Sequence, residues 1–422
     1  MKRCMFLSWF FVSLSSALCA QSKIPCDPAR LPVVFVHGFL GSGDNWALQA
    51  QRLEANGYCP SQIYAFDWNS LNRQSPSDSL LEVFIRRVLA STGAVKVDLV
   101  AHSAGGGVCS RYLSRPDRAV FVSRYVHIGS SPLAGQPGGV PTMNIYSKAD
   151  RIAARAGDIP GAENVRQTDN DHLQVVTSEE SFRAIFGFLQ PRQKPHTVLK
   201  PARAYEVSGV ALVLGENTPL KLCRVEVWVH DTITGRRKGN HPEWTGTTDT
   251  SGRWSGFRAN PFTAYEFVLK PGKGRVVHYF LEPFRYHNRF LYLRSLPSTG
   301  MAAMLLAGLP VDPGSSALAV FAANGAIITG RDTLNCNGTV LSSDVLTPPQ
   351  KTCIAMFLYD AGKDGAGTGT PIPLFGGAPF MNGADMFLPA STEKAIRLYY
   401  NGRTRVLPSI PSSEGVMVAV YE

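Results

Sequence analysis

The stretch that most constrains the fold of this chain is residues 97–107, an apolar run that leads into a serine and then into small residues. The apolar run predicts a buried strand, and the glycines after it predict a helix that packs closely against that strand. Ser103 would then lie on a sharp strand-to-helix turn that exposes its hydroxyl. Ala101 stands where the Gly-x-Ser-x-Gly pattern has its first glycine, so an ordinary turn remains an alternative for these residues alone.

Strand-like and helix-like segments alternate along residues 21–190. A continuous apolar run predicts a strand at 31–36, and strand-like runs predict further strands at 63–66, 97–102, 122–128, 142–147 and 163–166. Apolar residues at helical spacing predict helices at 44–57, 79–90 and 178–189, with Asp44 as the N-cap of the first. This alternation predicts an α/β fold with a doubly wound, mostly parallel sheet.

The pattern changes after the α/β region. Residues 191–202 are polar and punctuated by prolines, which is typical of a linker. Residues 203–297 contain short alternating runs separated by turn signals, which predicts a β-sandwich domain. Residues 298–422 again predict strands, joined by glycine- and proline-rich connections. We therefore expect one or two all-β domains, sandwich-like or barrel-like, to follow the α/β domain.

The first 20 residues have the layout of a secretory signal peptide. Lys2 and Arg3 precede an apolar stretch, and small residues follow by Ala20. We expect cleavage after Ala20 and a secreted or periplasmic protein. The apolar stretch is too short to span a membrane, and no later stretch predicts a transmembrane segment.

Composition excludes two further classes of protein. Hydrophobic residues make up 44% of the 422 residues, which excludes a wholly disordered chain and supplies material for packed cores. The formal net charge of +10 is spread without a long run of lysines and arginines. We therefore expect no nucleic-acid partner.

Disulfide bonds are expected because of the oxidising destination. Two of the eight cysteines fall within the expected signal peptide, and the sequence leaves the pairing of the other six open. From position alone we expect Cys26–Cys59, which flank one strand and helix, and Cys336–Cys353, which flank one loop-rich segment. Cys109 is expected to remain a buried thiol.

Candidate site residues follow the carboxyl ends of predicted strands, which meet at one edge of a parallel sheet. Phe39 follows the first strand, Ser103 the third, Asp150 the fifth, and His172 the last. The chain order of serine, aspartate and histidine is the one expected for a hydrolase of this topology. We predict Ser103 as nucleophile, His172 as the group that takes and returns the proton, and Asp150 as its partner. The backbone N–H groups of Phe39 and Ala104 are predicted to form the oxyanion hole.

Other residues compete for these roles. The competing histidines and aspartates near strand ends are His37, His102, His127, Asp158, Asp169 and Asp171. Strand-end placement favours Asp150, and His37 is expected to brace the loop that carries Phe39. His102 neighbours the nucleophile but should point away from it along the strand.

Leu40 and Trp68 are candidate substrate-binding residues, because both lie near the ends of predicted strands.

We expect no metal and no organic cofactor. No Cys/His cluster has the spacing of a zinc site, and residues 360–365 lack the later glutamate that completes a calcium loop.

Residues 31–190 resemble the small lid-less bacterial lipases of the Bacillus type, lipase class 2, within the α/β-hydrolase fold. The shared motifs are residues 32–39, 101–105, 145–150 and 171–173, and those lipases also carry alanine at the position of Ala101. The resemblance implies a carboxylic ester hydrolase without metal or cofactor. The minimal enzymes lack a β-rich region, but a secreted archaeal lipase is similar in layout, which implies that residues 203–422 help to bind the acyl chain.

We therefore predict a secreted serine lipase or esterase that forms an acyl-enzyme on Ser103 and acts on triacylglycerols or other acyl esters. One alternative is a polyester depolymerase of the polyhydroxyalkanoate type, and another is an inactive surface-binding protein. The short stretch between Ser103 and Asp150 leaves no room for a large lid, so we expect an open site unless the β region covers it. The sequence sets neither the acyl-chain length nor the oligomeric state.

Overall fold

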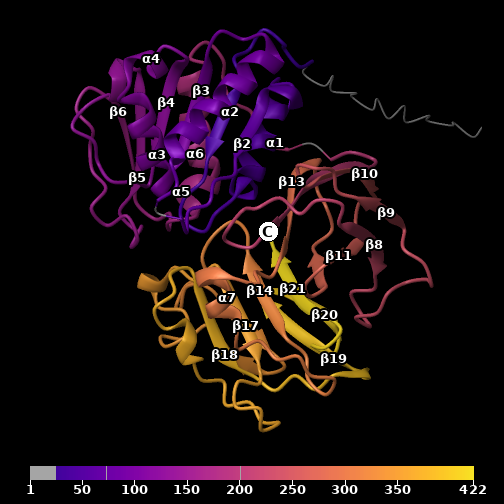
Figure 1. Ribbon diagram of the computed structural model, residues 1–422. Coiled ribbons are helices and arrows are strands. Elements are labelled where there is room, and N and C mark those ends of the chain that lie inside the picture. Colours follow the sequence, from indigo (N-terminus) through magenta and orange to yellow (C-terminus); the bar gives the residue numbers. More distant parts are fainter. Residues whose placement is uncertain (1–24, 73, 200) are drawn as a thin grey trace, which may run out of the picture.

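The computed structural model describes residues 25–422 apart from residues 73 and 200, and it contains an α/β unit followed by a larger β part (Figure 1). The expected signal peptide and its cleavage point lie outside the described residues. The α/β unit extends to the end of helix α6 at Leu189, and strand β7 of the β part begins at Tyr205.

A six-stranded parallel sheet forms the centre of the α/β unit, in the order β2-β1-β3-β4-β5-β6. Its strands are β1 (Val33–Val36), β2 (Ile63–Phe66), β3 (Val97–His102), β4 (Val122–Ile128), β5 (Thr142–Ser147) and β6 (Glu163–Gln167). The chain first moves from β1 to β2 and then returns to the other side of β1, where β3 lies. This reversal places the carboxyl ends of β1 and β3 at the switch point where α/β sheets bind ligands. The α/β class expected from the sequence is confirmed.

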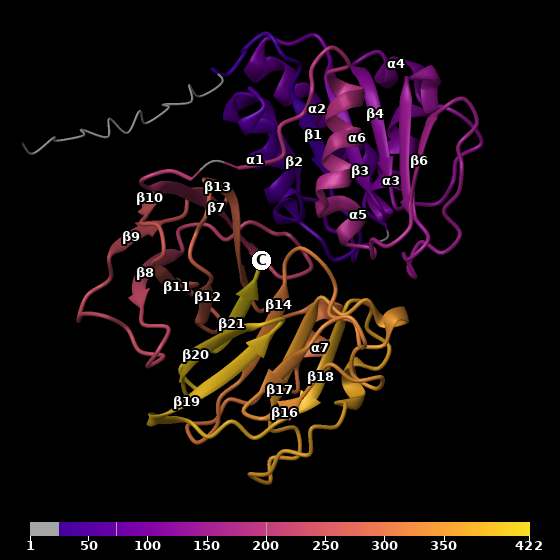
Figure 2. The same ribbon diagram turned by 180° about the vertical axis from the view of Figure 1, so that it is seen from behind.

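Helices cover both faces of this sheet, because its central strands carry apolar side chains on both faces. Val33 and Phe35 pack in the hydrophobic cluster that includes α1 and α6, whereas Val34 and Val36 pack in the cluster that includes α2 and α3. Figure 2 shows α6 lying across the sheet. The helices are α1 (Ala47–Ala55), α2 (Ser77–Thr92), α3 (Ala104–Leu113), α4 (Pro116–Ala119), α5 (Gln174–Thr177) and α6 (Glu179–Leu189), with short 3-10 helices η1 (Gly43–Trp46), η2 (Pro60–Gln62) and η3 (Pro137–Gly139).

The β part contains three sheets, of three, eight and four strands. Their orders are β10-β7-β13, β18-β17-β14-β21-β12-β11-β8-β9 and β16-β15-β19-β20. The strands are β7 (Tyr205–Val213), β8 (Arg224–His230), β9 (Trp244–Thr247), β10 (Arg253–Ala259), β11 (Ala264–Lys270), β12 (Val277–Leu281), β13 (Asn288–Ser295), β14 (Leu318–Ala322), β15 (Leu334–Cys336), β16 (Thr339–Val340), β17 (Ala355–Tyr359), β18 (Met381–Asp385), β19 (Ser391–Tyr400), β20 (Arg403–Ser409) and β21 (Val416–Tyr421). One helix, α7 (Gly300–Leu306), and the 3-10 helices η4 (Pro349–Lys351) and η5 (Pro373–Phe375) complete it.

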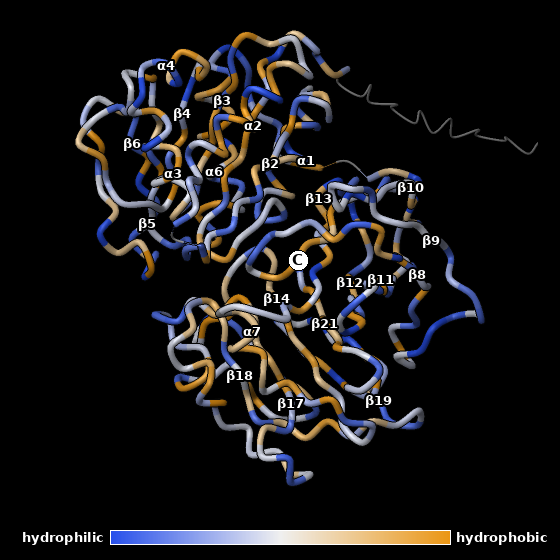
Figure 3. The backbone as a smooth tube through the Cα atoms, in the orientation of Figure 1, coloured by the Kyte–Doolittle hydropathy of each residue, from blue (hydrophilic) through white to orange (hydrophobic). Residues whose placement is uncertain are grey.

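The eight-stranded sheet is the middle layer of the β part. One of its faces packs against the three-stranded sheet, and the other packs against the four-stranded sheet. Strand β21 lies between β12 and β14 and runs parallel to both, so it joins the two expected β regions in one sheet. Outer connections such as the one from β8 to β9 are mostly hydrophilic (Figure 3). The division of the β part into domains at residues 203–297 and 298–422 stays a prediction.

The cysteines bear out one of the two expected pairs. Cys26 and Cys59 form a disulfide bond that ties the segment before β1 to the segment before β2. The expected Cys336–Cys353 bond is wrong, because both residues are free, buried thiols. Cys336 lies on β15 in the four-stranded sheet, whereas Cys353 pairs by its backbone with Ile327 outside that sheet. Both thiols instead serve as small apolar side chains of one hydrophobic cluster.

A buried carboxylate on β11 gives the β part a distinct response to acid. The Arg237 guanidinium donates to both carboxylate oxygens of Glu266, at 2.6 and 2.8 Å, and Nδ1 of His278 donates to Oε1 at 2.7 Å. Burial by itself raises the pKa of Glu266, but these hydrogen bonds outweigh it and lower the pKa to about 2. The charged form of Glu266 is therefore favoured more in the folded protein than in the unfolded chain.

We expect Glu266→Gln to destabilise the protein at neutral pH, with a difference from wild type that shrinks as the pH falls from about 4.5 towards about 2. The sign follows because a lowered pKa in the folded state contributes stability that protonation removes. Urea unfolding of both proteins at several pH values measures this difference. Glu414→Gln, at an exposed glutamate, is the matched control. A difference between Glu266→Gln and wild type that does not change with pH would contradict the assignment.

Candidate active site

Ser103 occupies the turn between β3 and α3 in a backbone conformation that serine rarely adopts, with φ of 52° and ψ of −126°. Three hydrogen bonds hold it there. The Ser103 N–H donates to the carbonyl of Ile128 at 2.9 Å, and the Ser103 carbonyl accepts from the hydroxyl of Ser130 and the N–H of Gly106, both at 2.8 Å. The side chain is thereby fixed at the carboxyl edge of the sheet.

The structure brings the three predicted side chains into one hydrogen-bonded chain. The hydroxyl of Ser103 lies 2.9 Å from Nε2 of His172, and Nδ1 of His172 lies 2.7 Å from Oδ2 of Asp150. Oδ1 of Asp150 accepts from the backbone N–H groups of Ile152 and Ala153, which fixes the carboxylate. Asp150 and His172 are buried and Ser103 is half-buried. This arrangement can deprotonate the serine hydroxyl while a buried carboxylate faces the imidazole.

The two backbone segments predicted for the oxyanion hole lie beside Ser103. Ala104 begins α3, and the first N–H groups of a helix have no acceptor within the helix. The loop that carries Phe39 passes close to the nucleophile, because a Cβ added to Gly38 would lie 2.9 Å from Cβ of Ser103. The N–H of Leu40 donates to the Ser70 hydroxyl at 2.8 Å. Phe39 lines the same cavity as Ser103.

The β part holds the loop that carries Phe39. Nδ2 of Asn217, which precedes β8, donates to the carbonyl of Gly41 at 2.8 Å and lies 3.1 Å from Nε2 of His37. Nδ1 of His37 donates to the carbonyl of Gly38 at 2.7 Å. Burial lowers the pKa of His37 to about 4, so its Nε2 is an acceptor at neutral pH. Asn217 therefore connects the β part to the loop that follows β1.

The β part also holds the loop that carries His172. Oδ2 of Asp171 accepts from the N–H of Ala326 at 3.0 Å and from the guanidinium of Arg331 at 2.9 Å. The hydroxyl of Thr177 donates to the carbonyl of Asn324 at 2.6 Å. The competing Asp171 is thus engaged with the β part rather than with an imidazole.

The remaining competing residues lie in other environments. His127 contacts the Tyr125 hydroxyl and the carbonyl of Ser131, and Asp158 pairs with Arg166 on the surface. Asp169 accepts from the neighbouring Thr168 hydroxyl. The ring of His102 lies beside that of His172, with 4.5 Å between their centroids. Burial, and next the adjacent His172, lower the pKa of His102 well below its usual value, so His102 is neutral.

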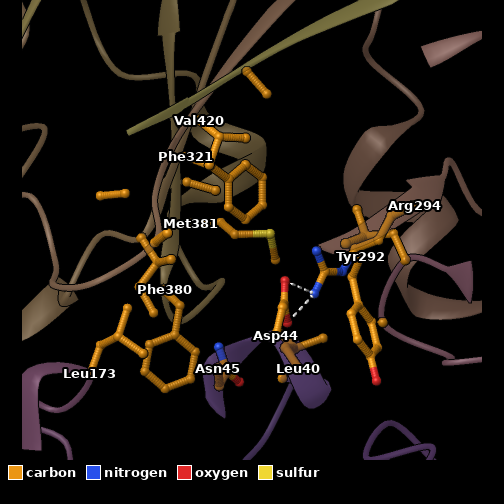
Figure 4. A pocket seen from close by; sticks show the side chains of 18 of the residues that line it. Leu40, Asp44, Asn45, Leu173, Tyr292, Arg294, Phe321, Phe380, Met381 and Val420 are labelled. Carbon is orange, nitrogen blue, oxygen red and sulfur yellow. Dashed lines mark hydrogen bonds and ion pairs between the residues drawn. The ribbon is translucent and has the colours of Figure 1, made fainter. Parts of the chain in front are cut away.

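A cavity of about 360 Å³ extends from Ser103 between the α/β unit and the β part. Its walls are mostly apolar and include Phe39, Leu40 and Leu173 from the α/β unit, together with Phe321, Phe380, Met381 and Val420 from the β part (Figure 4). The expected open cleft is therefore covered by the β part. Leu40 lines the cavity, whereas Trp68 stands outside its lining and donates its indole N–H to the carbonyl of His37.

One ion pair lies in the wall of this cavity. The guanidinium of Arg294 on β13 contacts both carboxylate oxygens of Asp44 at 2.6 Å (Figure 4). Asp44 was expected to cap a helix over 44–57, but that expectation is wrong. The segment begins as the 3-10 helix η1, and no side-chain cap is formed there, because the carboxylate faces Arg294 across the cavity wall.

The described part of the chain shows neither a metal-binding cluster nor a membrane-spanning helix. Residues 25–422, with the gaps at 73 and 200, contain no group of three or more histidines, cysteines, aspartates or glutamates placed to hold a metal ion. Within the same residues, no helix combines the length and the apolar character that crossing a membrane requires.

Three family models match parts of the chain. Residues 30–114, which include Ser103, match the model described as lipase (class 2). Residues 203–297 match the model of a lipase C-terminal domain, and residues 320–419 match a further model described as a C-terminal domain. The resemblance to class 2 lipases with an added C-terminal region is thereby confirmed.

Individual proteins are also similar to parts of this chain. A triacylglycerol lipase of Vibrio cholerae is 28% identical over 205 residues, a match that covers 45% of this chain and 64% of that relative. A triacylglycerol lipase of Pseudarthrobacter phenanthrenivorans is 31% identical over 94 residues, which covers 20% of this chain and 28% of that relative. The chain thus spans less than two thirds of either relative. Among solved structures, the Bacillus licheniformis lipase BlEst2 aligns with 39% of this chain and 94% of its own, at 19% identity and a TM-score of 0.32.

Proposed function

We propose that this protein is a secreted serine hydrolase that cleaves carboxylic esters of lipids. The observation that carries the proposal is the hydrogen-bonded chain from Ser103 through His172 to Asp150, which opens into an apolar cavity. The similarity to proteins named triacylglycerol lipases supports the choice of substrate class. The Cys26–Cys59 disulfide bond and the N-terminal sequence support export to an oxidising compartment.

The proposed reaction has two steps. In the first, the Ser103 hydroxyl attacks the ester carbonyl carbon as its proton moves to Nε2 of His172. The oxyanion accepts hydrogen bonds from the N–H groups of Ala104 and Phe39. The leaving alkoxide takes the proton from His172 and departs as the alcohol, so the acyl group remains on Ser103. In the second step, water attacks the acyl carbon as its proton moves to Nε2 of His172. The bond to Ser103 then breaks, His172 returns the proton to the serine oxygen, and the free acid is released.

The cavity suggests which part of the substrate enters the protein. Its walls offer apolar side chains from both the α/β unit and the β part, which suits a hydrocarbon chain better than a polar or charged group. We infer that the acyl chain lies against Leu40 and the β part while the ester carbonyl reaches Ser103. This inference favours acyl esters with flexible chains over the bulky backbone of a polyester.

Hydrolysis of p-nitrophenyl esters from acetate to palmitate, with Ser103→Ala as the control, tests the proposal. We expect turnover that depends on Ser103, with KM falling as the acyl chain lengthens because more apolar surface is buried. Clearing of a polyhydroxyalkanoate emulsion without turnover of long acyl esters would favour the depolymerase instead. A wild-type protein without turnover on any of these esters would contradict the proposal and favour a surface-binding role.

A further inference from the structure

Phe380 reaches from the β part to the imidazole of His172. It lies in the connection between η5 and β18, and its ring is stacked on the ring of His172, with 5.7 Å between the centroids and 6° between the planes. The residue is 8% exposed and lines the same cavity as Ser103 (Figure 4).

The backbone at Phe380 is held in an unusual conformation. Its φ is 64°, in the left-handed region that bulky side chains rarely adopt. Three hydrogen bonds keep it there. The carbonyl of Phe380 accepts from the N–H groups of Ile354 and Ala355, at 2.7 and 3.0 Å, and its N–H donates to the carbonyl of Lys351 at 3.3 Å. Strained residues of this kind cluster at functional sites because the surrounding structure must be built to hold them.

We propose that Phe380 is a positioning residue for His172, whose ring face fixes the plane of the imidazole and stabilises the imidazolium formed during ester cleavage. The proposal rests on the proposed function. An aromatic face attracts a cation, and the attraction grows where water is excluded, as it is beside a buried imidazole. The other ring beside His172 is the neutral His102, which contributes no charge of its own.

A merely structural role predicts a different result. If Phe380 only lined the cavity, its loss would raise KM for long acyl chains and leave acetate esters almost unaffected, because an acetyl group fills little of the cavity. A positioning role lowers kcat for every ester, including acetate, because His172 acts in each reaction. The acetate ester therefore separates the two roles.

The experiment uses the full chain with two variants that remove the ring. Phe380→Leu keeps apolar volume, and Phe380→Gly accepts a φ of 64° without strain, so it keeps the test valid if the leucine variant does not fold. Both should lower kcat on p-nitrophenyl acetate about 5- to 30-fold, with little change in KM. Phe380→Tyr keeps the aromatic face and should retain most of the wild-type kcat.

Phe375→Leu is the matched control. Phe375 is the last residue of η5, just before the connection that carries Phe380, and it is fully buried, but it stacks on Phe357 at 5.1 Å and does not line the cavity. This variant should lower Tm and leave kcat on acetate within about twofold of wild type. Unchanged kcat in the folded ring-removal variants, or an equal loss in Phe375→Leu, would overturn the positioning role. An inactive wild-type protein would instead refute the proposed function, and this inference with it.

Discussion

Replacing His172 by alanine should reduce kcat for ester hydrolysis by on the order of 10⁴- to 10⁶-fold, nearly as much as replacing Ser103. The two side chains lie 2.9 Å apart, so Nε2 of His172 is placed to take the proton of the serine hydroxyl. Without the imidazole, the serine hydroxyl keeps its proton and remains a weak nucleophile. Because the residues act as a unit, the double variant His172→Ala/Ser103→Ala should be little worse than either single variant.

Steady-state kinetics on a short ester measures this loss, and circular dichroism shows whether the variant is folded. His196→Ala is the matched control, since His196 is exposed and lies outside the cavity lining. It should retain wild-type kcat. Activity of His172→Ala within about 100-fold of wild type would mean that another group accepts the proton.

Gly105→Ala should cost about 3 kcal/mol of unfolding free energy and lower kcat about 100-fold. A Cβ at this position would lie 2.5 Å from the carbonyl oxygen of His37 and 2.6 Å from that of Val36. Both contacts are backbone atoms of β1 and the loop after it, which cannot rotate away as a side chain can. Helix α3 would have to move off the sheet, and Ser103 at its N-terminus would move with it.

Gly107→Ala offers a control in the same helix. Its added Cβ would meet only the end of the Arg111 side chain, at 3.7 Å. Because alanine favours the helix and restricts the unfolded chain, this variant should gain about 0.4–1 kcal/mol. Urea unfolding and kinetics on the two purified variants measure both effects. Equal stability of Gly105→Ala and Gly107→Ala would show that α3 does not need its close approach to β1.

The sequence predicts those parts of the fold that local patterns determine. The spacing of apolar residues predicts the strands and helices of the α/β unit. A parallel sheet places the carboxyl ends of its strands at one edge. These two patterns predict that Ser103, Asp150 and His172 lie in one site. The structure places their side chains in hydrogen-bonding contact. Their catalytic roles stay predictions until they are tested.

The sequence does not predict contacts between the α/β unit and the β part. Asp44 has the local features of an N-cap, but it pairs with Arg294, which is far along the chain and carries no local signal of that contact. Asn217 and Phe380 lie in connections whose sequences look like ordinary turns. The φ of 64° at Phe380 is unexpected from propensity alone, and its hydrogen bonds to residues 351, 354 and 355 are not visible in the local sequence.

These contacts change how the β part can be studied. Deleting residues 203–422 would remove the cavity wall, but it would also remove Asn217 from the loop after β1 and Arg331 from the loop that carries His172. A truncated protein should therefore lose activity on short and long esters alike. Point substitutions in the full chain separate acyl-chain binding from the support of the catalytic loops, which a deletion cannot do.

The position of β21 has a consequence for when activity can arise. This strand is synthesised after the other described strands, yet it lies inside the eight-stranded sheet between β12 and β14, and Val418 and Val420 line the cavity. Pairing across such sequence separation is slow, because a long loop must close first. A growing chain can complete the α/β sheet early, but the cavity lacks the part of its wall that β21 supplies until this strand is inserted. We therefore expect ester hydrolysis to begin only after β21 has been synthesised and inserted between β12 and β14.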